Sequence, residues 1–438
     1  MKPNITDDNS LCEYAIQCAL DAGCREAKVV LQSSTSDSVE WRDGEQDYVS
    51  GEESRSMAIE LFVDGRYSIV DTNRLNYDTL RQFINTNVAN TRHLAEDRHR
   101  YLPKTEEYYQ SPKDDDLGLV DPHYFATTFE QKSEVANALC SEMSHPDTVS
   151  ATAAVSSSKQ KKVVMTSNGF CGKNNITHYS ISANISVKGY DDERTEDYMY
   201  TASTRWGELT KSDIGTAALN KAIAKRGAKR IASGRYNIVV DRLVVSKLLN
   251  PLIAAIGGNA QYYKNSFLLD KKGEQIVSPL LTLTDTPTQR GMIGAALFDN
   301  ECRPLSDMPI IKDGTLCNYL ISLYMSRKMN ITATRGGTTI LEFGNCCGTQ
   351  ANLIAQMERG LLITGFNGGN SNATTGDFSF GIEGFMVENG ICIHPISEML
   401  ITGNMLTLWN NLVAVADDAP NYVSWHTPSL LFAGVDIS

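Results

Sequence analysis

The sequence lacks several features that define whole classes of protein. No run of about 18 apolar residues occurs, which excludes a helix long enough to cross a membrane. The first eight residues, MKPNITDD, are polar, so we expect no secretory signal and a cytoplasmic protein. With 42% hydrophobic and 21% charged residues among 438, the chain is long and apolar enough for two or three folded domains.

Histidine is scarce, and neither histidine nor cysteine has the spacing of a metal site. The seven histidines form no H-E-x-x-H or H-x-H motif, and the ten cysteines form no C-x-x-C pair. Six residues separate Cys12 from Cys18 and Cys18 from Cys24, which on a helix turns successive thiols about 240° apart. The sequence therefore predicts reduced, structural cysteines and no metal site that spacing alone reveals.

The acidic balance of the chain argues against direct binding of phosphate groups. The formal net charge is −12, and the string nearest to a phosphate-binding loop, SNGFCGKNN, fails at two required positions. One basic cluster lies on a predicted helix that begins near Asp213: Lys221, Lys225, Arg226, Lys229 and Arg230. Lys221, Lys225 and Lys229 would share one helix face. A solvated surface is the usual role of such a face, and contact with nucleic acid is the alternative.

The order of the hydrophobic patterns predicts an α+β fold in three parts. Residues 1–103 are expected to form a small N-terminal unit, with two helices around a meander of strands in AKVVLQ, SVEWR, MAIELFV and YSIVDT. A polar linker over residues 104–116 leads to a strand-rich central region over residues 117–233. Residues 234–438 are expected to form a larger β-rich domain with antiparallel sheets.

Four dipeptides predict hairpin turns between these strands. Asp-Gly and Asn-Gly tolerate the positive φ angles of two-residue turns. The four predicted turns are Asp43-Gly44, Asp64-Gly65, Asp313-Gly314 and Asn389-Gly390.

Glycine is concentrated between residues 360 and 411, in a segment that begins GLLITGFNGGNSNATTGDFSFGIEGFMVENG. Such density marks sharp turns or the close approach of another backbone. A strand edge that accepts an extended peptide is one explanation. Tight turns in a packed, barrel-like sheet are the other.

The same segment resembles the C-terminal signature of the TldD/PmbA family, and specifically its PmbA branch, also called TldE and once described as modulators of DNA gyrase. The matching strings continue with HPISEMLITGN and MLTLWNNLVAVADD. Upstream, FLLDKKGEQIVSPLLTLTDTP and IIKDGTLCNYLISLYMSRKM also resemble the family, and so does the N-terminal string VEWRDGEQDYVSGEESRSMAIELFVDGRYSIVDTN. The resemblance covers nearly the whole chain.

The resemblance implies a cytoplasmic zinc metalloprotease of two related subunits that acts on extended peptides, with roles in microcin precursor maturation and antitoxin degradation. In TldD-type subunits a helix with H-E-x-x-x-H and a cysteine near the C-terminus bind the zinc. The corresponding helix here reads VVSKLLNPLIAAIGGNAQYY, with neither histidine nor acid from Ile253 to Gly258. No cysteine follows Cys392, and the tail offers only His426. The resemblance therefore implies a chain without its own zinc site, with zinc in a TldD-like partner.

The leading hypothesis is thus a PmbA-type subunit that pairs with a TldD-like catalytic subunit or with a second copy of itself. Substrate would bind as an extended peptide at the glycine-rich segment, at Gly376, Asp377, Gly381 and Gly384. One alternative is a self-sufficient metallopeptidase in which folding gathers histidines from three regions: His178, His394 and His426. Another is a non-enzymatic modulator of gyrase or nucleic acid that acts through residues 221–230.

Overall fold

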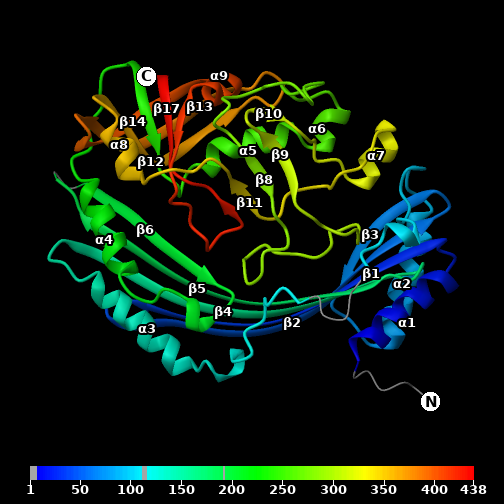
Figure 1. Cartoon of the computed structure of the whole chain (residues 1–438). Coiled ribbons are helices and arrows are strands. Elements are labelled where there is room, and N and C mark those ends of the chain that lie inside the picture. The colour runs from blue at the N-terminus through cyan, green and yellow to red at the C-terminus, as the bar shows by residue number, and fades with distance from the viewer. Residues whose placement is uncertain (1–6, 111–115, 191–192) are drawn as a thin grey trace.

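A computed structural model describes residues 7–110, 116–190 and 193–438. Residues 1–6 and residues 111–115 of the predicted linker lie outside the described residues. The C-terminal half of the chain sits above one long curved sheet, and helices lie below that sheet (Figure 1). Within the described ranges, no helix is both long and apolar enough to cross a membrane.

The long sheet is antiparallel and has six strands, in the order β3-β2-β1-β4-β5-β6. The strands are β1 (Glu26–Arg42), β2 (Glu45–Val63), β3 (Arg66–Thr72), β4 (Thr148–Thr166), β5 (Cys171–Lys188) and β6 (Arg194–Ser203). AKVVLQ and SVEWR, expected as separate strands, are the two ends of β1. β1 also pairs with β4, from Lys28 opposite Thr166 to Arg42 opposite Thr152. One continuous sheet therefore joins the N-terminal and central parts of the sequence.

Alternation along these strands separates two faces. Odd-numbered residues such as Val29, Ile59, Met165 and Ile181 are buried against helices on the convex face. The helices are α1 (Asp8–Asp21), α2 (Tyr77–Thr91), α3 (Phe129–Glu142) and α4 (Ile214–Ala224). Even-numbered residues point toward the C-terminal half. The period of two thus decides which side chains can reach a site between the halves.

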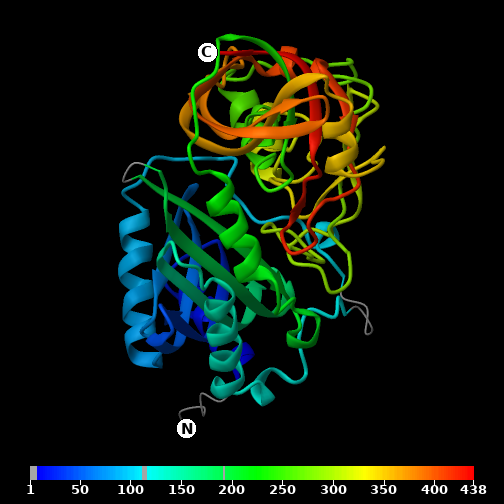
Figure 2. The ribbon, with the colours of Figure 1, turned by 90° about the vertical axis from the view of Figure 1, so that its left-hand side faces the viewer.

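The C-terminal half contains a closed barrel of five strands. Its strands are β7 (Gly234–Val240), β12 (Arg359–Ser371), β13 (Asp377–Glu388), β14 (Ile391–Asn404) and β17 (Leu430–Ile437). They pair in the order β14-β13-β12-β7-β17, and β14 pairs again with β17 at Ile401 opposite Ile437. β15 (Leu412–Val415) extends the sheet beyond β17. In the side view of Figure 2 the orange and red strands curl around at the top of the molecule.

A second, five-stranded sheet lies beside the barrel, in the order β10-β9-β8-β11-β16. Its strands are β8 (Leu283–Asp285), β9 (Met308–Lys312), β10 (Thr315–Leu316), β11 (Leu341–Phe343) and β16 (Trp425–His426). The accompanying helices are α5 (Ser246–Ala255), α6 (Gly258–Tyr262), α7 (Leu323–Met329), α8 (Gln350–Ala355) and α9 (Met405–Asn410). Most strand pairs are antiparallel, as expected, but β12–β7 and β11–β16 are parallel. A shared apolar core containing Trp409, Phe380 and Phe432 holds this half together.

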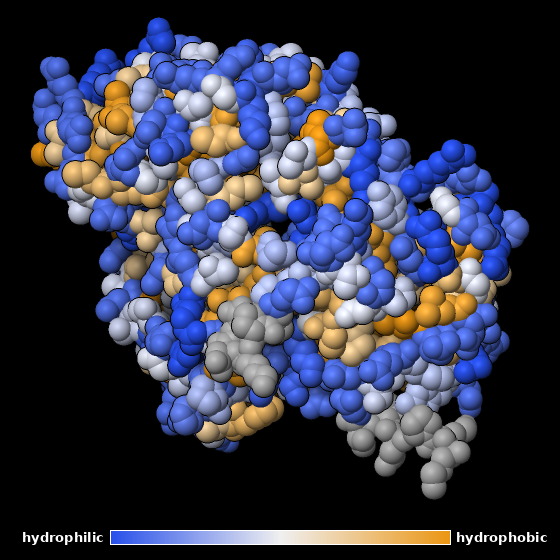
Figure 3. All heavy atoms as spheres, turned by 45° about the vertical axis from the view of Figure 1, so that its right-hand side comes forward, coloured by the Kyte–Doolittle hydropathy of each residue, from blue (hydrophilic) through white to orange (hydrophobic). Residues whose placement is uncertain are grey.

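The four predicted hairpin turns are confirmed. Asp43 and Gly44 have φ of 51° and 86°, and both residues of the other three dipeptides also have positive φ. They join β1 to β2, β2 to β3, β9 to β10, and β13 to β14. Hydrophilic side chains cover most of the face shown in Figure 3, because most large apolar side chains are packed inside the molecule.

Candidate functional site

A cavity of about 720 Å³, the central cavity, lies between the concave face of the long sheet and the C-terminal half. The sheet contributes Lys162 and Asn174, and the segment after α2 contributes Arg100. The C-terminal half contributes residues 254, 257–260, 296, 298–301, 305, 320, 322, 324, 325 and 335–339. A smaller hollow of about 390 Å³, the side pocket, adjoins it, since both are lined by Arg100, Lys162 and Tyr324. The site is therefore built from both halves of the chain.

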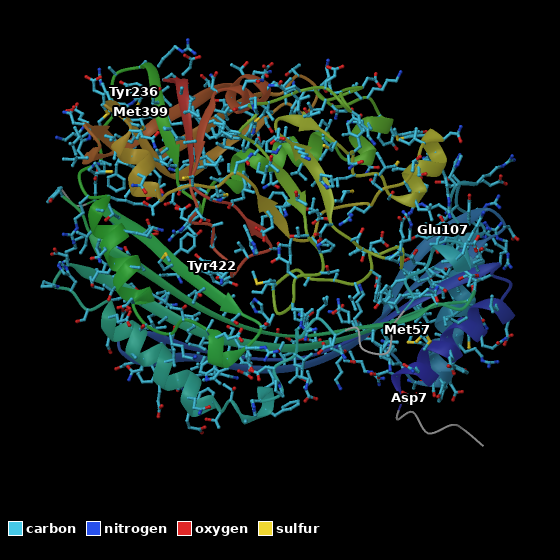
Figure 4. The ribbon with its side chains drawn as sticks, viewed as in Figure 1. Asp7, Met57, Glu107, Tyr236, Met399 and Tyr422 are labelled. Carbon is cyan, nitrogen blue, oxygen red and sulfur yellow. The ribbon has the colours of Figure 1, made fainter. Side chains whose placement is uncertain are left out.

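The two halves are tied together at both ends of the sheet. At one end Tyr324 Oη on α7 donates to Asp97 Oδ2 over 2.6 Å, and Arg327 Nη2 donates to the carbonyl of Leu102 over 3.1 Å. At the other end Lys225 Nζ lies 2.7 Å from Glu383 Oε1 on β13. Tyr422, which belongs to the C-terminal half, lies near β6 in Figure 4, and its ring centroid is 6.0 Å from that of Tyr200 on β6. These contacts fix the width of the cavity.

The segment from Ile253 to Gly258, which the resemblance aligns with the zinc helix of TldD-type subunits, forms part of the cavity wall. α5 ends at Ala255, and Ala254, Gly257 and Gly258 line the cavity at its C-terminal end. A Cβ atom on Gly258 would lie 3.1 Å from the Met325 side chain, so α7 packs closely against this turn. None of these three lining residues has a side-chain donor atom. These three residues therefore offer no side-chain ligand for zinc.

Histidines from other parts of the chain are not gathered into a metal site. Across residues 7–110, 116–190 and 193–438, no group of three or more His, Cys, Asp and Glu side chains is placed to hold a metal ion. His178 lies on β5, where burial lowers its pKa. His394 lies on β14, with Nδ1 3.1 Å from the Pro395 carbonyl oxygen. His426, on β16, bonds to a carboxylate. The geometry gives no support to a zinc site made from these three residues.

His426 has a structural partner in the neighbouring strand. Its Nδ1 lies 2.6 Å from Oε1 of Glu342 on β11, and Nε2 of Gln289 donates to the same oxygen over 2.8 Å. Burial favours the neutral form of Glu342, but the bonds from His426 and Gln289 outweigh it and lower the pKa of Glu342. The pair thus fastens β16 to β11 within the second sheet.

The glycine-rich segment belongs to the barrel. A Cβ on Gly381 would lie 2.2 Å from the Asn367 carbonyl oxygen, and one on Gly384 would lie 1.9 Å from that of Leu362. β12 therefore approaches β13 so closely that only glycine fits. β13 is also paired with β14 on its other edge. A peptide cannot add as a strand at Gly381 and Gly384 without displacing one of these neighbours.

The other two predicted substrate residues lie at the turn that leads into β13. Gly376 has a φ of 80°, which favours glycine. Asp377 accepts hydrogen bonds from Asn404 Nδ2 over 3.0 Å and from Thr375 Oγ1 over 2.7 Å, and these bonds lower its pKa. Substrate binding by the four residues stays a prediction, and their present contacts stabilise the turn and the barrel.

The predicted basic helix face is wrong in its extent. α4 ends at Ala224, so Lys229 does not continue the face of Lys221 and Lys225. The cause is Gly227, whose φ of 67° turns the chain out of the helix. Within α4 and just beyond it, the cations are paired with acids: Lys221 and Lys225 each lie 2.9 Å from an Asp197 carboxylate oxygen. Lys221, Lys225 and Arg226 are therefore engaged by acids, and Lys225 connects the halves through Glu383.

The sequence-based prediction missed the cations of the cavity, Arg100 and Lys162. Strand alternation could have indicated Lys162, because Val163 and Met165 are buried on the convex face and the even-numbered positions beside them point the other way. No local pattern could have indicated that Arg100 reaches the same space.

The curved sheet with its helices, and the C-terminal half that encloses the cavity with it, match the domains of a metallopeptidase family. Family models match three consecutive segments: PmbA/TldA metallopeptidase domain 1 over residues 27–91, the central domain over 122–230 and the C-terminal domain over 233–438. The chain therefore belongs to the PmbA/TldD family.

Individual relatives agree with this assignment. The chain is 30% identical over 281 residues to the metalloprotease PmbA homolog of Haemophilus influenzae, across 63% of this chain and 62% of the relative. It is 31% identical over 254 residues to metalloprotease PmbA of Escherichia coli O157:H7, across 57% of this chain and 55% of the relative. The chain thus matches less than two thirds of the length of these curated relatives.

Solved structures match over nearly the full length. A protein from Bacteroides thetaiotaomicron, named a modulator of DNA gyrase, is 41% identical with a TM-score of 0.96, and the match covers 99% of this chain and 100% of that one. TldE from Thermococcus kodakarensis is 17% identical with a TM-score of 0.84, over 98% of this chain and 100% of that one. The second likeness concerns the fold alone.

Proposed function

We propose that this chain is a PmbA-type subunit of a two-component, cytoplasmic zinc metalloprotease. It forms part of the chamber that holds an extended peptide, while a TldD-like partner holds the zinc and hydrolyses the bond. The proposal is supported by the cavity wall at Ala254, Gly257 and Gly258, three residues without a side-chain donor atom. By resemblance, this segment corresponds to the zinc helix of TldD-type subunits. The family relationship supports the class of reaction.

The cavity suits a peptide because its wall mixes groups of several kinds. Phe298, Leu305 and Met325 supply apolar surface, while Asn174 and Asn259 supply amides. Extended peptides need both, since their backbone requires hydrogen bonds and their side chains require apolar contact. By resemblance, the substrates would be microcin precursors or antitoxin chains. The expected assembly is a pair with a TldD-like chain, and a homodimer is the alternative.

Peptide hydrolysis tests the division of labour. The full chain alone, a TldD-like partner alone and the mixture are each given an unfolded fluorogenic peptide, with zinc added or removed. We expect zinc-dependent hydrolysis only when the partner is present, and a mixture more active than the partner alone. Strong zinc-dependent hydrolysis by the isolated chain, or zinc bound to it in stoichiometric amount, would contradict the proposal.

A cavity-filling variant tests the chamber itself. Ala254 is exposed to the cavity, so Ala254→Trp places an indole in the peptide's path and should lower hydrolysis by the mixture at least about tenfold. Ala224→Trp is the matched control, because Ala224 is an exposed alanine at the last position of α4. Equal activity of the two variants would show that peptide does not pass this wall.

A further inference from the structure

Two positive side chains face the central cavity without an anionic partner. Arg100 and Lys162 line both the central cavity and the side pocket. Within the described part of the chain, neither side chain donates a hydrogen bond or forms an ion pair, whereas the nearby Lys28 binds Glu60 over 2.8 Å and the Asn300 carbonyl over 2.5 Å. The cavity therefore contains positive charge that the described residues do not neutralise by contact.

Arg100 is held in place by two aromatic rings, one from each half of the chain. Its guanidinium carbon lies 4.7 Å from the ring centroid of Tyr67 on β3 and 3.4 Å from that of Tyr324 on α7. Tyr67 Oη donates to Glu60 Oε2 over 2.9 Å, and Tyr324 Oη donates to Asp97 Oδ2 over 2.6 Å. Stacking leaves the N–H groups at the guanidinium edge available for a planar anion.

Lys162 is half-buried on the concave face of β4. Burial lowers the pKa of its ammonium group, and the neighbouring charge of Lys28 lowers it further. Both effects make the protonated form of Lys162 less favourable than that of a lysine in water. An anion within hydrogen-bond distance would reverse them, so Lys162 gains more from a bound carboxylate than a solvated lysine would.

The carboxylates around the cavity are already engaged. Asp299 accepts two backbone N–H groups, at 2.8 and 2.9 Å, and Glu301 accepts two more, at 2.7 and 3.1 Å. Burial raises the pKa of both acids, because it makes their charged forms less favourable than in water. Glu60 and Asp97 bind the tyrosine hydroxyls and their neighbours. These acids therefore stabilise the cavity wall, and none of them forms an ion pair with Arg100 or Lys162.

We propose that the central cavity binds a carboxylate of the peptide between Arg100 and Lys162. This inference rests on the proposed function, because it names the substrate class of the same chamber: peptides with a free C-terminal carboxylate or an acidic side chain at the bound position. Gly336, Gly337 and Thr338 line the same cavity, and their backbone N–H groups donate to no described residue, so these groups are available as further donors.

Calorimetric titration of the full chain tests the preference. Three acetylated five-residue alanine-leucine peptides are compared: one with a free C-terminus, one with an amidated C-terminus, and one amidated with a glutamate inside. We expect at least one of the two carboxylate peptides to bind about tenfold to a hundredfold more tightly than the neutral peptide. The tighter of the two identifies the source of the carboxylate. Equal affinity for all three overturns the proposal.

Variants connect the preference to the two cations. Lys162→Met and Arg100→Gln should each remove most of the preference for carboxylate peptides. Arg100→Lys should retain part of that preference, because the positive charge remains. Lys161→Met is the matched control, since Lys161 is exposed and the strand alternation directs it to the opposite face. Thermal melting confirms that each variant is folded. A carboxylate preference that survives in both Lys162→Met and Arg100→Gln overturns the assignment.

A chemical readout separates this inference from the proposed function. The chain is treated with an amine-acylating reagent, with N-acetylglycine or N-acetylglycinamide added, and modified lysines are mapped by mass spectrometry. Protection of Lys162 but not Lys161 by the carboxylate alone supports the anion site even if no peptide binds, in which case the chamber function fails. Peptide binding with no carboxylate preference and no protection supports the chamber and overturns the anion site.

Discussion

Two lysines at opposite ends of the long sheet show how the same residue type acquires different roles. Lys225 and Lys162 both lie where the sheet meets the C-terminal half, and burial is the largest effect on each ammonium group. Bonds to Glu383 and Asp197 outweigh burial at Lys225 and raise its pKa, while nothing comparable among the described residues faces Lys162, whose pKa falls. The presence of carboxylate partners, more than the degree of burial, therefore distinguishes a structural lysine from one that is available to a ligand.

Charge reversal at the paired end should have the largest effect. Lys225→Glu places a third carboxylate beside Asp197 and Glu383, and the Asp197 side chain is only 6% exposed. We expect the free energy of unfolding to fall by about 3–5 kcal/mol, as when a buried pair loses one partner. Urea unfolding measures the change. Lys161→Glu is the control, because Lys161 is exposed, and it should change stability by less than about 0.5 kcal/mol.

Loss of the Asp197 carboxylate charge should lower the free energy of unfolding by less, and by an amount that depends on pH. Burial favours neutral Asp197, but bonds from Lys221 and Lys225 outweigh it and lower its pKa. A lowered folded-state pKa stabilises the fold above the unfolded-state value of about 4, and this stabilisation is lost as the pH falls further through the folded-state pKa. Asp197→Asn should cost about 2 kcal/mol at pH 7 and progressively less below about pH 4.

Urea unfolding of the Asp197→Asn variant and the unaltered chain, from neutral pH down through the acidic range, gives this difference directly. A difference that stays constant over the whole range would mean that the carboxylate charge contributes nothing.

Removal of the unpaired charge of Lys162 should change the free energy of unfolding least, and should raise it. The lowered pKa of Lys162 means that the unfolded chain holds its proton more tightly, so stability rises with pH between the folded-state and unfolded-state values. Below that interval the charged form is a cost. Lys162→Met should therefore raise the unfolding free energy by about 1 kcal/mol at pH 7, since solvent reaches this half-buried group.

That gain should shrink as the pH approaches about 10, and Lys161→Met should show neither the gain nor the trend. Destabilisation by Lys162→Met would indicate a partner for this lysine and would break the contrast with Lys225.

Local features of the fold could be predicted because their causes are local. Asp43-Gly44 and Asn389-Gly390 turn the chain through their own positive φ angles. The pairing of β1 with β4 could not be predicted, because the strands lie far apart in sequence and alternation does not say which strands meet. The spacing of the lysines predicts a basic face that runs past Ala224, but the positive φ of Gly227 ends the helix before Lys229.

The candidate site also has parts that the sequence could predict and parts that it could not. The resemblance placed Ile253 to Gly258 at the functional position, and Gly257 and Gly258 do line the cavity. Glycine density alone does not show whether a substrate or a neighbouring strand approaches β13, and in the fold the close neighbour of Gly381 and Gly384 is β12. Arg100 and Lys162 were missed for a related reason, since the absence of a partner among the described residues is a property of the folded surroundings.

The closed barrel has a consequence for the order of events during synthesis. Its ring includes β7, near the middle of the chain, and β17, which pairs with both β7 and β14. Until β17 has emerged from the ribosome, β7 and β14 each present an unpaired edge. The nascent chain can complete its long sheet well before that moment, because all six strands of that sheet precede β7. The long sheet can therefore form before the barrel does, and the barrel closes only after β17 has emerged.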